Sequence, residues 1–221
     1  MGNIVYKLLF IKSFITIIER GGRMSSSIRL FNNISKIYGL FFNFQVGYYT
    51  KILDRVRAEF DITEFNTVLD VGCGTGALSH LLDDNGLKVT GVDTSQGMLN
   101  QASKKLKNKD IDLIRIVPGE KLPFPDNSFD IAISTYVAHG LKPKERIEFY
   151  KEMKRVSKEY IVLHDYNETR GLLTTIIEWL EKGDYFNFIK VVKNELEELF
   201  EEFKVVDVDT RAAWYICRSN K

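Results

Sequence analysis

The chain has 221 residues, of which 44% are hydrophobic and 28% charged, with a formal net charge of +1. These values fit one globular domain with a sizeable core. A net charge this close to zero gives no reason to expect a nucleic-acid or membrane partner. The two cysteines, Cys73 and Cys217, lie far apart and form no C-x-x-C pair. We therefore expect no zinc or other metal, no disulfide framework and a cytoplasmic location.

The first apolar stretch, residues 4–18, is interrupted by two lysines and is shorter than the roughly 20 residues that a spanning helix needs. The stretch is therefore expected either to form a helix at a membrane interface or not to belong to the natural protein. In neither case do we expect stable insertion into a membrane. Residues 19–23, immediately before Met24, can all be encoded by purine-rich codons. A ribosome-binding site in the gene has such a sequence and, if translated in frame, would give these residues. We therefore expect translation to start at Met24, residues 1–23 to be a mis-assigned or flexible N-terminal extension, and residues 24–221 to form a single domain.

Residues 24–64 carry many aromatic side chains at helical spacing and predict a helical cap in front of a sheet. One helix is expected to reach Tyr38, before Gly39, and a second to run over about residues 44–60. An aromatic stripe of this kind is usually packed core, so most of these rings are expected to be buried.

The sequence VLDVGCGTGALSHLL at residues 68–82 predicts a buried strand, a turn with three glycines and an apolar-striped helix over residues 75–84. A strand-to-helix turn this tight needs a positive φ, which glycine adopts without steric cost. The helix directs its unpaired N–H groups and the positive end of its dipole toward the turn. The turn therefore predicts a site for a nucleotide-like ligand.

The spacing of the turn narrows the choice of ligand. Gly72, Gly74 and Gly76 form G-x-G-x-G with Asp70 two positions earlier, whereas dinucleotide-binding enzymes use G-x-G-x-x-G. Asp93 ends the next expected strand, 17 residues after Gly76, where a carboxylate can accept from both hydroxyls of a ribose. No P-loop lysine follows, which disfavours a triphosphate. An NAD-dependent oxidoreductase remains an alternative that cofactor titration would separate.

The rest of the chain continues to alternate strands and helices, as a parallel sheet requires. After a helix that begins near Gln96, we expect strands over residues 111–117, 129–134 and 160–165, a helix over 144–156, and a final strand pair over 204–209 and 212–218.

The segments VLDVGCGTG, GVDTSQGML and LPFPDNSFDIAIS, in this order and at this spacing, resemble the class I S-adenosylmethionine-dependent methyltransferases. The resemblance implies an α/β, Rossmann-like, doubly wound sheet of seven mostly parallel strands in the order 3-2-1-4-5-7-6, with the last strand antiparallel. It implies a cofactor-binding core over residues 66–165, a helical lid insertion over 166–203 and a C-terminal strand pair over 204–221. The N-terminal helices would complete the lid. The implied methyl donor is S-adenosyl-L-methionine, and the implied reaction is methyl transfer to an unidentified small-molecule acceptor.

The resemblance also implies which residues contact the donor. Glu120 stands where relatives more often carry an aspartate that accepts from the adenine amino group, and Tyr38 where they often carry an aromatic residue. Met98 either packs against the adenine or is plain core. The full expected set is Asp70, Gly72, Cys73, Gly74, Gly76, Asp93, Thr94, Met98, Glu120, Lys121, Ser134 and Tyr38.

The acceptor is expected near residues 134–141, at the carboxyl end of the fourth strand. This segment lacks the N/D-P-P-Y/F motif of methyltransferases that act on nucleobase amines, which argues against a nucleic-acid substrate. His139 matches a histidine of the small-molecule branch. It is either a proton acceptor in catalysis or a side chain hydrogen-bonded across the turn. The expected substrate contacts are Tyr136, His139, Asp165 and Tyr166.

Two further alternatives stay open. The N-terminal sequence FNNISKIYG resembles the opening of quinone C-methyltransferases, although the other hallmarks of that subfamily after strand four are absent. A protein that binds the donor without turnover is also compatible with the motifs. The acidic residues near the end of the insertion, from Glu195 to Glu202, are interpreted as a solvated surface.

Overall fold

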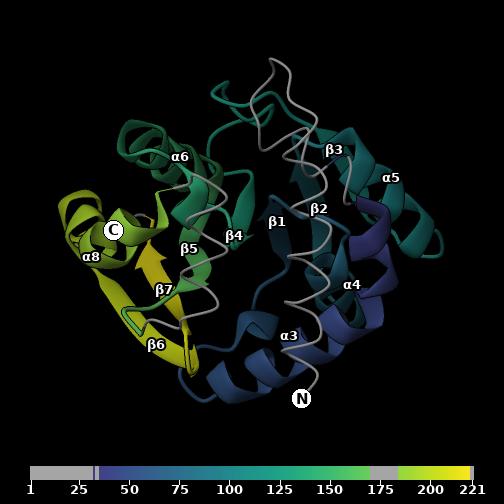
Figure 1. The fold of residues 1–221 in the computed structure, drawn as a ribbon, viewed down its shortest axis with the longest axis horizontal. Helices are drawn as coiled ribbons and strands as arrows, with labels where there is room; N and C mark the ends of the chain where they lie inside the picture. The colour runs from purple at the N-terminus through teal and green to yellow at the C-terminus, as the bar shows by residue number, and fades with distance from the viewer. Residues whose placement is uncertain (1–31, 33–34, 170–183, 220–221) are drawn as a thin grey trace.

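The computed structural model describes residue 32, residues 35–169 and residues 184–219. The expectations for residues 1–23 and for the middle of the insertion lie outside this part of the chain. The described residues form a seven-stranded sheet in the order β3-β2-β1-β4-β5-β7-β6 (Figure 1), which confirms the predicted topology. The strands are β1 (Thr67–Val71), β2 (Lys88–Asp93), β3 (Asp112–Arg115), β4 (Phe129–Thr135), β5 (Ser157–Tyr166), β6 (Phe203–Asp209) and β7 (Ala212–Arg218).

The first five strands pair in parallel, and β7 lies antiparallel to both β5 and β6. Parallel strands that share a sheet end at the same edge, so β1, β2, β4 and β5 present their carboxyl ends together. In open α/β sheets this edge is where ligands bind.

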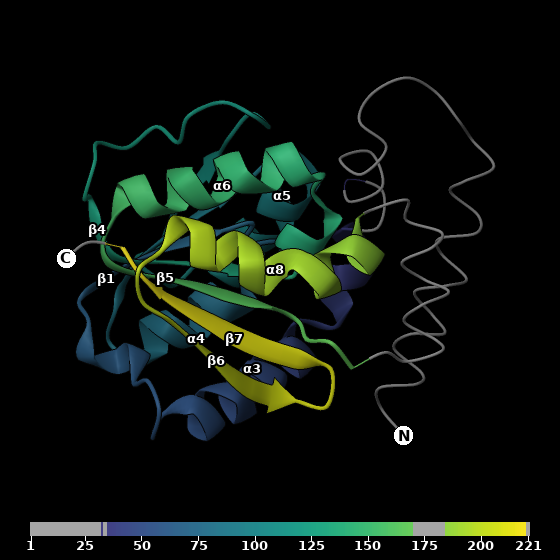
Figure 2. The same cartoon turned by 90° about the vertical axis from the view of Figure 1, so that its left-hand side faces the viewer.

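Helices cover both faces of the sheet, with α6 and α8 on one side and α3 and α4 on the other (Figure 2). Tyr150 and Met153 of α6 pack into one buried apolar cluster, while Leu53 of α3 and Leu82 of α4 pack into a second with Trp214. The helices are α3 (Phe42–Val56), α4 (Ala77–Asp84), α5 (Gln96–Lys105), α6 (Pro143–Val156) and α8 (Tyr185–Leu199), with short 3₁₀ turns η1 (Ile62–Glu64) and η2 (Ala138–Gly140). Among the described residues no helix is long and apolar enough to cross a membrane.

Some element ends differ from the predicted ones for local reasons. Helix α4 begins at Ala77, later than expected, because Gly76 takes a left-handed conformation with φ of 78° and acts as its N-cap. Helix α3 ends at Val56, short of residue 60, and the chain then turns through η1, where Asp61 accepts from the backbone N–H of Thr63 at 3.0 Å. Strand β3 is shorter than predicted, and it lies at the edge of the sheet with one neighbour only.

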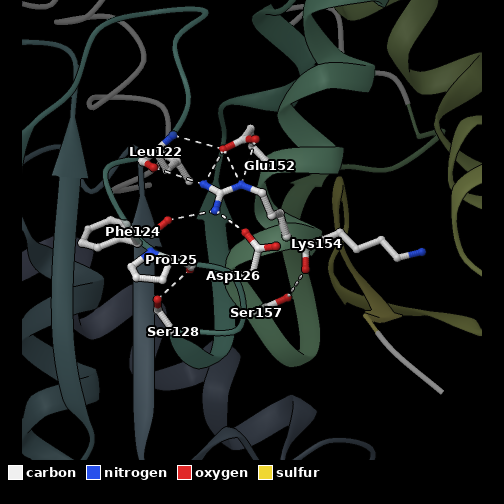
Figure 3. A network of polar contacts seen from close by, with 9 residues as sticks. Leu122, Phe124, Pro125, Asp126, Ser128, Glu152, Lys154 and Ser157 are labelled. Atoms are coloured by element: carbon white, nitrogen blue, oxygen red, sulfur yellow. Dashed lines mark hydrogen bonds and ion pairs between the residues drawn. The ribbon is translucent and has the colours of Figure 1, made fainter.

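The turn-rich segment before β4 is fastened to α6 by a charged network (Figure 3). The guanidinium of Arg155 donates to the carbonyls of Leu122 (3.1 Å) and Phe124 (2.8 Å) and to the carboxylates of Asp126 and Glu152, both at 2.8 Å. Glu152 in turn accepts from the N–H of Leu122 at 3.1 Å. Charge-assisted bonds of this kind are stronger than neutral ones, so they fix where β4 enters the sheet.

Candidate functional site

The glycine turn between β1 and α4 wraps around the end of β2. The backbone N–H groups of Gly72 and Cys73 both donate to the carbonyl of Val92, at 2.8 and 3.0 Å. Gly74 has a φ of 56°, and no other described atom lies within 4 Å of where its Cβ would be. The backbone at Gly74 therefore offers an open surface that a ligand can approach without meeting a side chain.

Asp93 ends β2 beside this surface. Its Oδ2 accepts from the N–H of Gly74 at 2.9 Å and its Oδ1 from the N–H of Ser95 at 2.7 Å. Because each carboxylate oxygen can accept more than one hydrogen bond, both retain capacity for the two hydroxyls of a ribose. The side chain is 9% exposed, and burial raises the pKa of its carboxyl. This geometry fits the expected role of Asp93.

Asp70 lies at the end of β1 under the same turn and is fully buried. Its Oδ2 accepts from the hydroxyl of Ser79 at 2.6 Å, but its Oδ1 has no hydrogen-bond partner among the described residues. Burial, together with the charge of Asp93, raises the pKa of this carboxyl to about 7. A buried acceptor atom without a donor is costly, so it indicates a group that a bound ligand supplies. The ammonium end of the expected donor fits that need.

Four other predicted donor contacts lie around these two carboxylates. Ser134 is buried at the end of β4, and its hydroxyl donates to the carbonyl of Val71 at 2.8 Å, so it also holds two strands together. Cys73 is buried behind the turn, and Thr94 is half-buried next to Asp93. Met98 is 3% exposed within α5, as its core interpretation requires. Their contact with a donor remains a prediction.

The remaining predicted donor contacts are less enclosed. Glu120 and Lys121 are exposed in the loop that follows β3. That loop leaves the same edge as Asp93, because the N–H of Ile116 donates to the carbonyl of Asp93 at 3.0 Å. Tyr38 is half-buried on the helical residues 35–40 that precede α3. Their contact with a donor also remains a prediction.

The N-terminal cap touches the turn through side chains that sequence reasoning did not single out. Gln45 of α3 accepts from the hydroxyl of Thr75 at 3.0 Å. Asn32 accepts from the hydroxyl of Ser95 and from the N–H of Gly97, both at 2.8 Å. The cap therefore lies directly over the start of α5, as a lid would.

On the acceptor side, the chain leaves β4 through a left-handed residue. Tyr136 has a φ of 54°, although it is not a glycine, and its N–H donates to the carbonyl of His164 at 2.9 Å. The next residue, Val137, packs so tightly on the turn that a Cβ at Gly72 would lie 2.5 Å from its Cγ2. A left-handed conformation in a residue other than glycine, as at Tyr136, costs about 1–3 kcal/mol, and such strained residues are common at functional sites.

His139 and Asp165 form a buried pair. Nδ1 of His139 lies 2.8 Å from Oδ1 of Asp165, and the same carboxylate accepts from the backbone N–H groups of His139 (3.2 Å) and Tyr166 (2.8 Å). Because a carboxylate can only accept, Nδ1 carries a proton, and in the neutral ring Nε2 holds the basic lone pair. The oxygens of Asp165 therefore orient His139, and the predicted contact of Asp165 with the substrate stays a prediction.

Aromatic rings surround this pair. The ring of His139 lies 4.8 Å from that of Tyr166, 6.3 Å from Tyr136 and 6.4 Å from Phe188, between ring centres. Tyr166 also lies 5.2 Å from Tyr136 and 4.9 Å from Tyr185 of α8. The four predicted substrate residues are thus brought together at one edge of the sheet, and α8 adds rings that the sequence did not assign to the site.

Three more residues extend the cluster behind Tyr136. The hydroxyl of Tyr48, from α3, lies 3.1 Å from the hydroxyl of Tyr136 and 3.4 Å from Nε2 of His164. The indole N–H of Trp214 donates to Nδ1 of His164 at 3.0 Å. These residues are far apart in the sequence, and no motif marked them.

Comparison with known proteins agrees with the geometry. The family described as "Methyltransferase domain" matches residues 69–163. The chain is 30% identical to the demethylmenaquinone methyltransferase of Staphylococcus aureus, over 83% of this chain and 86% of that protein.

Solved structures share the fold. A putative S-adenosylmethionine-dependent methyltransferase from Methanococcus maripaludis is similar with a TM-score of 0.63 and 20% identity, over 90% of this chain and 95% of that one. An S-adenosylmethionine-dependent methyltransferase from Aquifex aeolicus is similar with a TM-score of 0.54 and 24% identity, over 79% of this chain and 98% of that one. Together with the strand order, these comparisons confirm the resemblance and the methyl donor that it implied.

Proposed function

This chain belongs to the S-adenosylmethionine-dependent methyltransferases, and on that premise we propose that it methylates a small aromatic acceptor that carries a ring hydroxyl. The observation that carries the proposal is the His139–Asp165 pair, buried among aromatic rings at the carboxyl ends of β4 and β5. A histidine base can take the proton of an acidic hydroxyl, and the surrounding aromatic side chains can pack against a planar ring that carries it.

The donor would be held by the other half of the same edge. Asp93 would accept from the ribose hydroxyls, Asp70 would accept from the ammonium group, and the backbone at Gly74 would lie against the ligand. S-adenosylmethionine supplies an electrophilic methyl group on a sulfonium. The protein then mainly aligns the partners and removes water, which is the usual division of work with an activated cofactor.

His139 would take the hydroxyl proton of the acceptor at Nε2. Asp165 fixes the tautomer, because it binds the proton on Nδ1 at 2.8 Å and stabilises the ring once it is charged. Loss of that proton leaves negative charge on the oxygen and on the ring carbons beside and opposite it. Either the oxygen or such a carbon then becomes the nucleophile.

A quinone-type ring is the acceptor class that the comparisons favour. The S. aureus relative is named for a demethylated menaquinone, and its reduced ring would carry hydroxyls of the kind that His139 requires. The rings of Tyr136, Tyr166 and Phe188 would provide edges and faces for a planar partner. This supports the quinone alternative that the N-terminal sequence raised.

The setting that we propose is the cytoplasm. Cys73 and Cys217 are both buried free thiols and are far from any partner thiol in the sequence, as in proteins of reducing compartments. Cell fractionation would test this placement, and recovery outside the cytoplasm would contradict it.

Methyl-labelled donor and a panel of acceptors test the function. The purified protein is incubated anaerobically with labelled S-adenosylmethionine and 1,4-dihydroxynaphthalene, 1-naphthol or naphthalene, and the products are separated. We expect label in the two hydroxylated compounds and none in naphthalene, which has no proton for His139 to remove. Donor binding without transfer to any hydroxylated ring would overturn the proposal in favour of a donor-binding protein.

A further inference from the structure

Asn32 joins the N-terminal cap to the start of α5 through its side-chain oxygen. The hydroxyl of Ser95 and the backbone N–H of Gly97 both donate to Oδ1 of Asn32, each at 2.8 Å. A backbone N–H can only donate, so the amide atom that faces Gly97 must be the oxygen. The orientation of the Asn32 amide is therefore fixed, and one atom of the cap holds two groups at the start of α5.

Ser95 carries this contact on to the donor site. Its side chain is buried, and its hydroxyl accepts from the N–H of Met98 at 3.2 Å while it donates to Asn32. Its backbone N–H donates to Oδ1 of Asp93 at 2.7 Å, and the N–H of Gly74 donates to Oδ2 of the same carboxylate at 2.9 Å. A continuous series of hydrogen bonds thus runs from the cap to the carboxylate that is proposed to bind the ribose.

Gly97 leaves room for the cap to come this close. A Cβ at this position would lie 2.9 Å from the Cα and 3.0 Å from the carbonyl oxygen of Asn32, and backbone atoms cannot turn away as the end of a side chain can. The φ of Gly97 lies outside the left-handed region, so the backbone of α5 does not itself require glycine here. The contact with Asn32 is what requires a residue without a side chain.

The rest of the cap is held in place independently of Asn32. Phe42 of α3 is buried in one apolar cluster with Ala77 of α4 and Ala102 of α5. Removal of the Asn32 side chain should therefore leave α3 packed on its neighbours and the protein folded. The effect of such a change on the donor site can then be measured in a folded protein.

Two neighbouring hydroxyls can donate to one carboxylate only when its oxygens have the right orientation. The N–H of Ser95 holds Oδ1 of Asp93, and Asn32 holds Ser95. We infer that Asn32 is a positioning residue for the methyl donor, which sets the orientation of the Asp93 carboxylate toward the ribose from the N-terminal cap. The inference rests on the proposed role of Asp93 and adds the residue of the cap on which that role depends.

Two ligands test whether Asn32 acts through Asp93. S-adenosylhomocysteine and its 2′-deoxy analogue differ only in one ribose hydroxyl, and calorimetry gives the Kd of each. We expect the wild-type protein to bind the ribose form about tenfold more tightly, and Asn32→Ala to bind it about threefold more tightly or less, because a hydrogen bond to a charged group contributes this much and depends on its geometry. The Kd of the deoxy analogue should change less than that of the ribose form.

A second variant and a matched control accompany Asn32→Ala. Gly97→Ala keeps the Asn32 side chain but places a Cβ against its backbone, so it should lose the preference as well. Alanine is a better helix former than glycine, so α5 should form in this variant. Asn100→Ala removes an exposed amide from α5, which accepts from Gln96 at 3.0 Å, and should keep the wild-type preference. Circular dichroism checks that each variant is folded.

The outcomes separate this inference from the proposed function. Folded Asn32→Ala and Gly97→Ala proteins that keep the wild-type preference would overturn the role of Asn32. Equal weakening of both ligands, or loss of the fold in both variants, would overturn it too, because Asn32 would then hold the cap in general. A wild-type protein that binds the two ligands equally contradicts the ribose role of Asp93 and the inference with it. Methyl transfer to a hydroxylated ring tests the proposed function independently of all these results.

Discussion

Replacing Asp70 by asparagine should stabilise the donor-free protein, by an amount that grows with pH. In the native protein this carboxyl is fully buried, one of its oxygens has no partner among the described residues, and its pKa is raised from 3.8 to about 7. The native state therefore binds more protons than the unfolded state between these two values. By linkage, the free energy of unfolding falls as the pH rises through this range.

The magnitude follows from the shift in pKa. A difference of about 3 pKa units corresponds to about 4 kcal/mol of destabilisation once the pH is above 7, and to under about 2 kcal/mol at pH 5. Asparagine carries no charge and can still accept from Ser79 at 2.6 Å through its amide oxygen. The stability gained by Asp70→Asn should therefore be about 3 kcal/mol larger at pH 8.5 than at pH 5.

Urea unfolding at the two pH values, without donor, measures this difference. Asp112→Asn, which changes an exposed aspartate on the edge strand β3, is the matched control and should show no such trend. The same Asp70→Asn protein should bind S-adenosylmethionine more weakly, because the buried acceptor for the ammonium group loses its charge. If Asp70→Asn changes the free energy of unfolding by the same amount at pH 5 and pH 8.5, Asp70 is not a buried carboxylate with a raised pKa, and the reasoning is refuted.

Two other substitutions test the donor half of the site. Asp93→Ala should abolish donor binding in calorimetry, since it removes both the proposed ribose acceptor and the bonds that hold Gly74 and Ser95; unchanged affinity would refute the ribose assignment. Gly72→Ala should destabilise the protein by more than the about 1–2 kcal/mol of left-handed strain, because its Cβ would lie 2.5 Å from Val137. Gly86→Ala, with φ of 88° and open space, should cost the strain alone, and equal unfolding energies for the two variants would contradict the close packing at Gly72.

The sequence was most informative where the chemistry is local. The three glycines, the acid before them and Asp93 lie within one strand–turn–helix–strand unit, so their spacing predicted a site for a nucleotide-like ligand, and the resemblance then identified the methyl donor. The strand order followed from the resemblance and was confirmed. The turn depends on backbone conformations that only glycine adopts readily, so the glycines themselves mark its position in the sequence.

The acceptor side was only partly predictable. His139 and Asp165 were each singled out, but their pairing depends on how β4 and β5 align, and the sequence assigned Asp165 to the substrate. Tyr48 lies 88 residues from Tyr136 and 116 from His164, so no local pattern could join them. Such contacts arise from tertiary packing alone.

One residue of a surface prediction was wrong for the same reason. Glu197, Glu198, Glu201 and Glu202 are exposed, as expected. Glu195 of α8, from the same group, instead binds the guanidinium of Arg146 through two bonds of 2.6 Å. Arg146 is fully buried and also donates to Asp184 and to the carbonyl of Leu141, next to η2. A buried arginine in an amphipathic helix looks like any exposed one in the sequence, since its partner lies 49 residues away.

The most direct measurement of the proposed reaction is the single-turnover rate of methyl transfer to 1,4-dihydroxynaphthalene in His139→Gln, at saturating donor. Glutamine keeps a donor for Asp165 but cannot take a proton, so we predict a rate about 100-fold lower than wild type, with donor affinity unchanged. His80→Gln, which alters a histidine that pairs with Asp84 on the outside of α4, should match the wild-type rate. A His139→Gln protein that transfers methyl as fast as the wild type would contradict the role of His139 as the base.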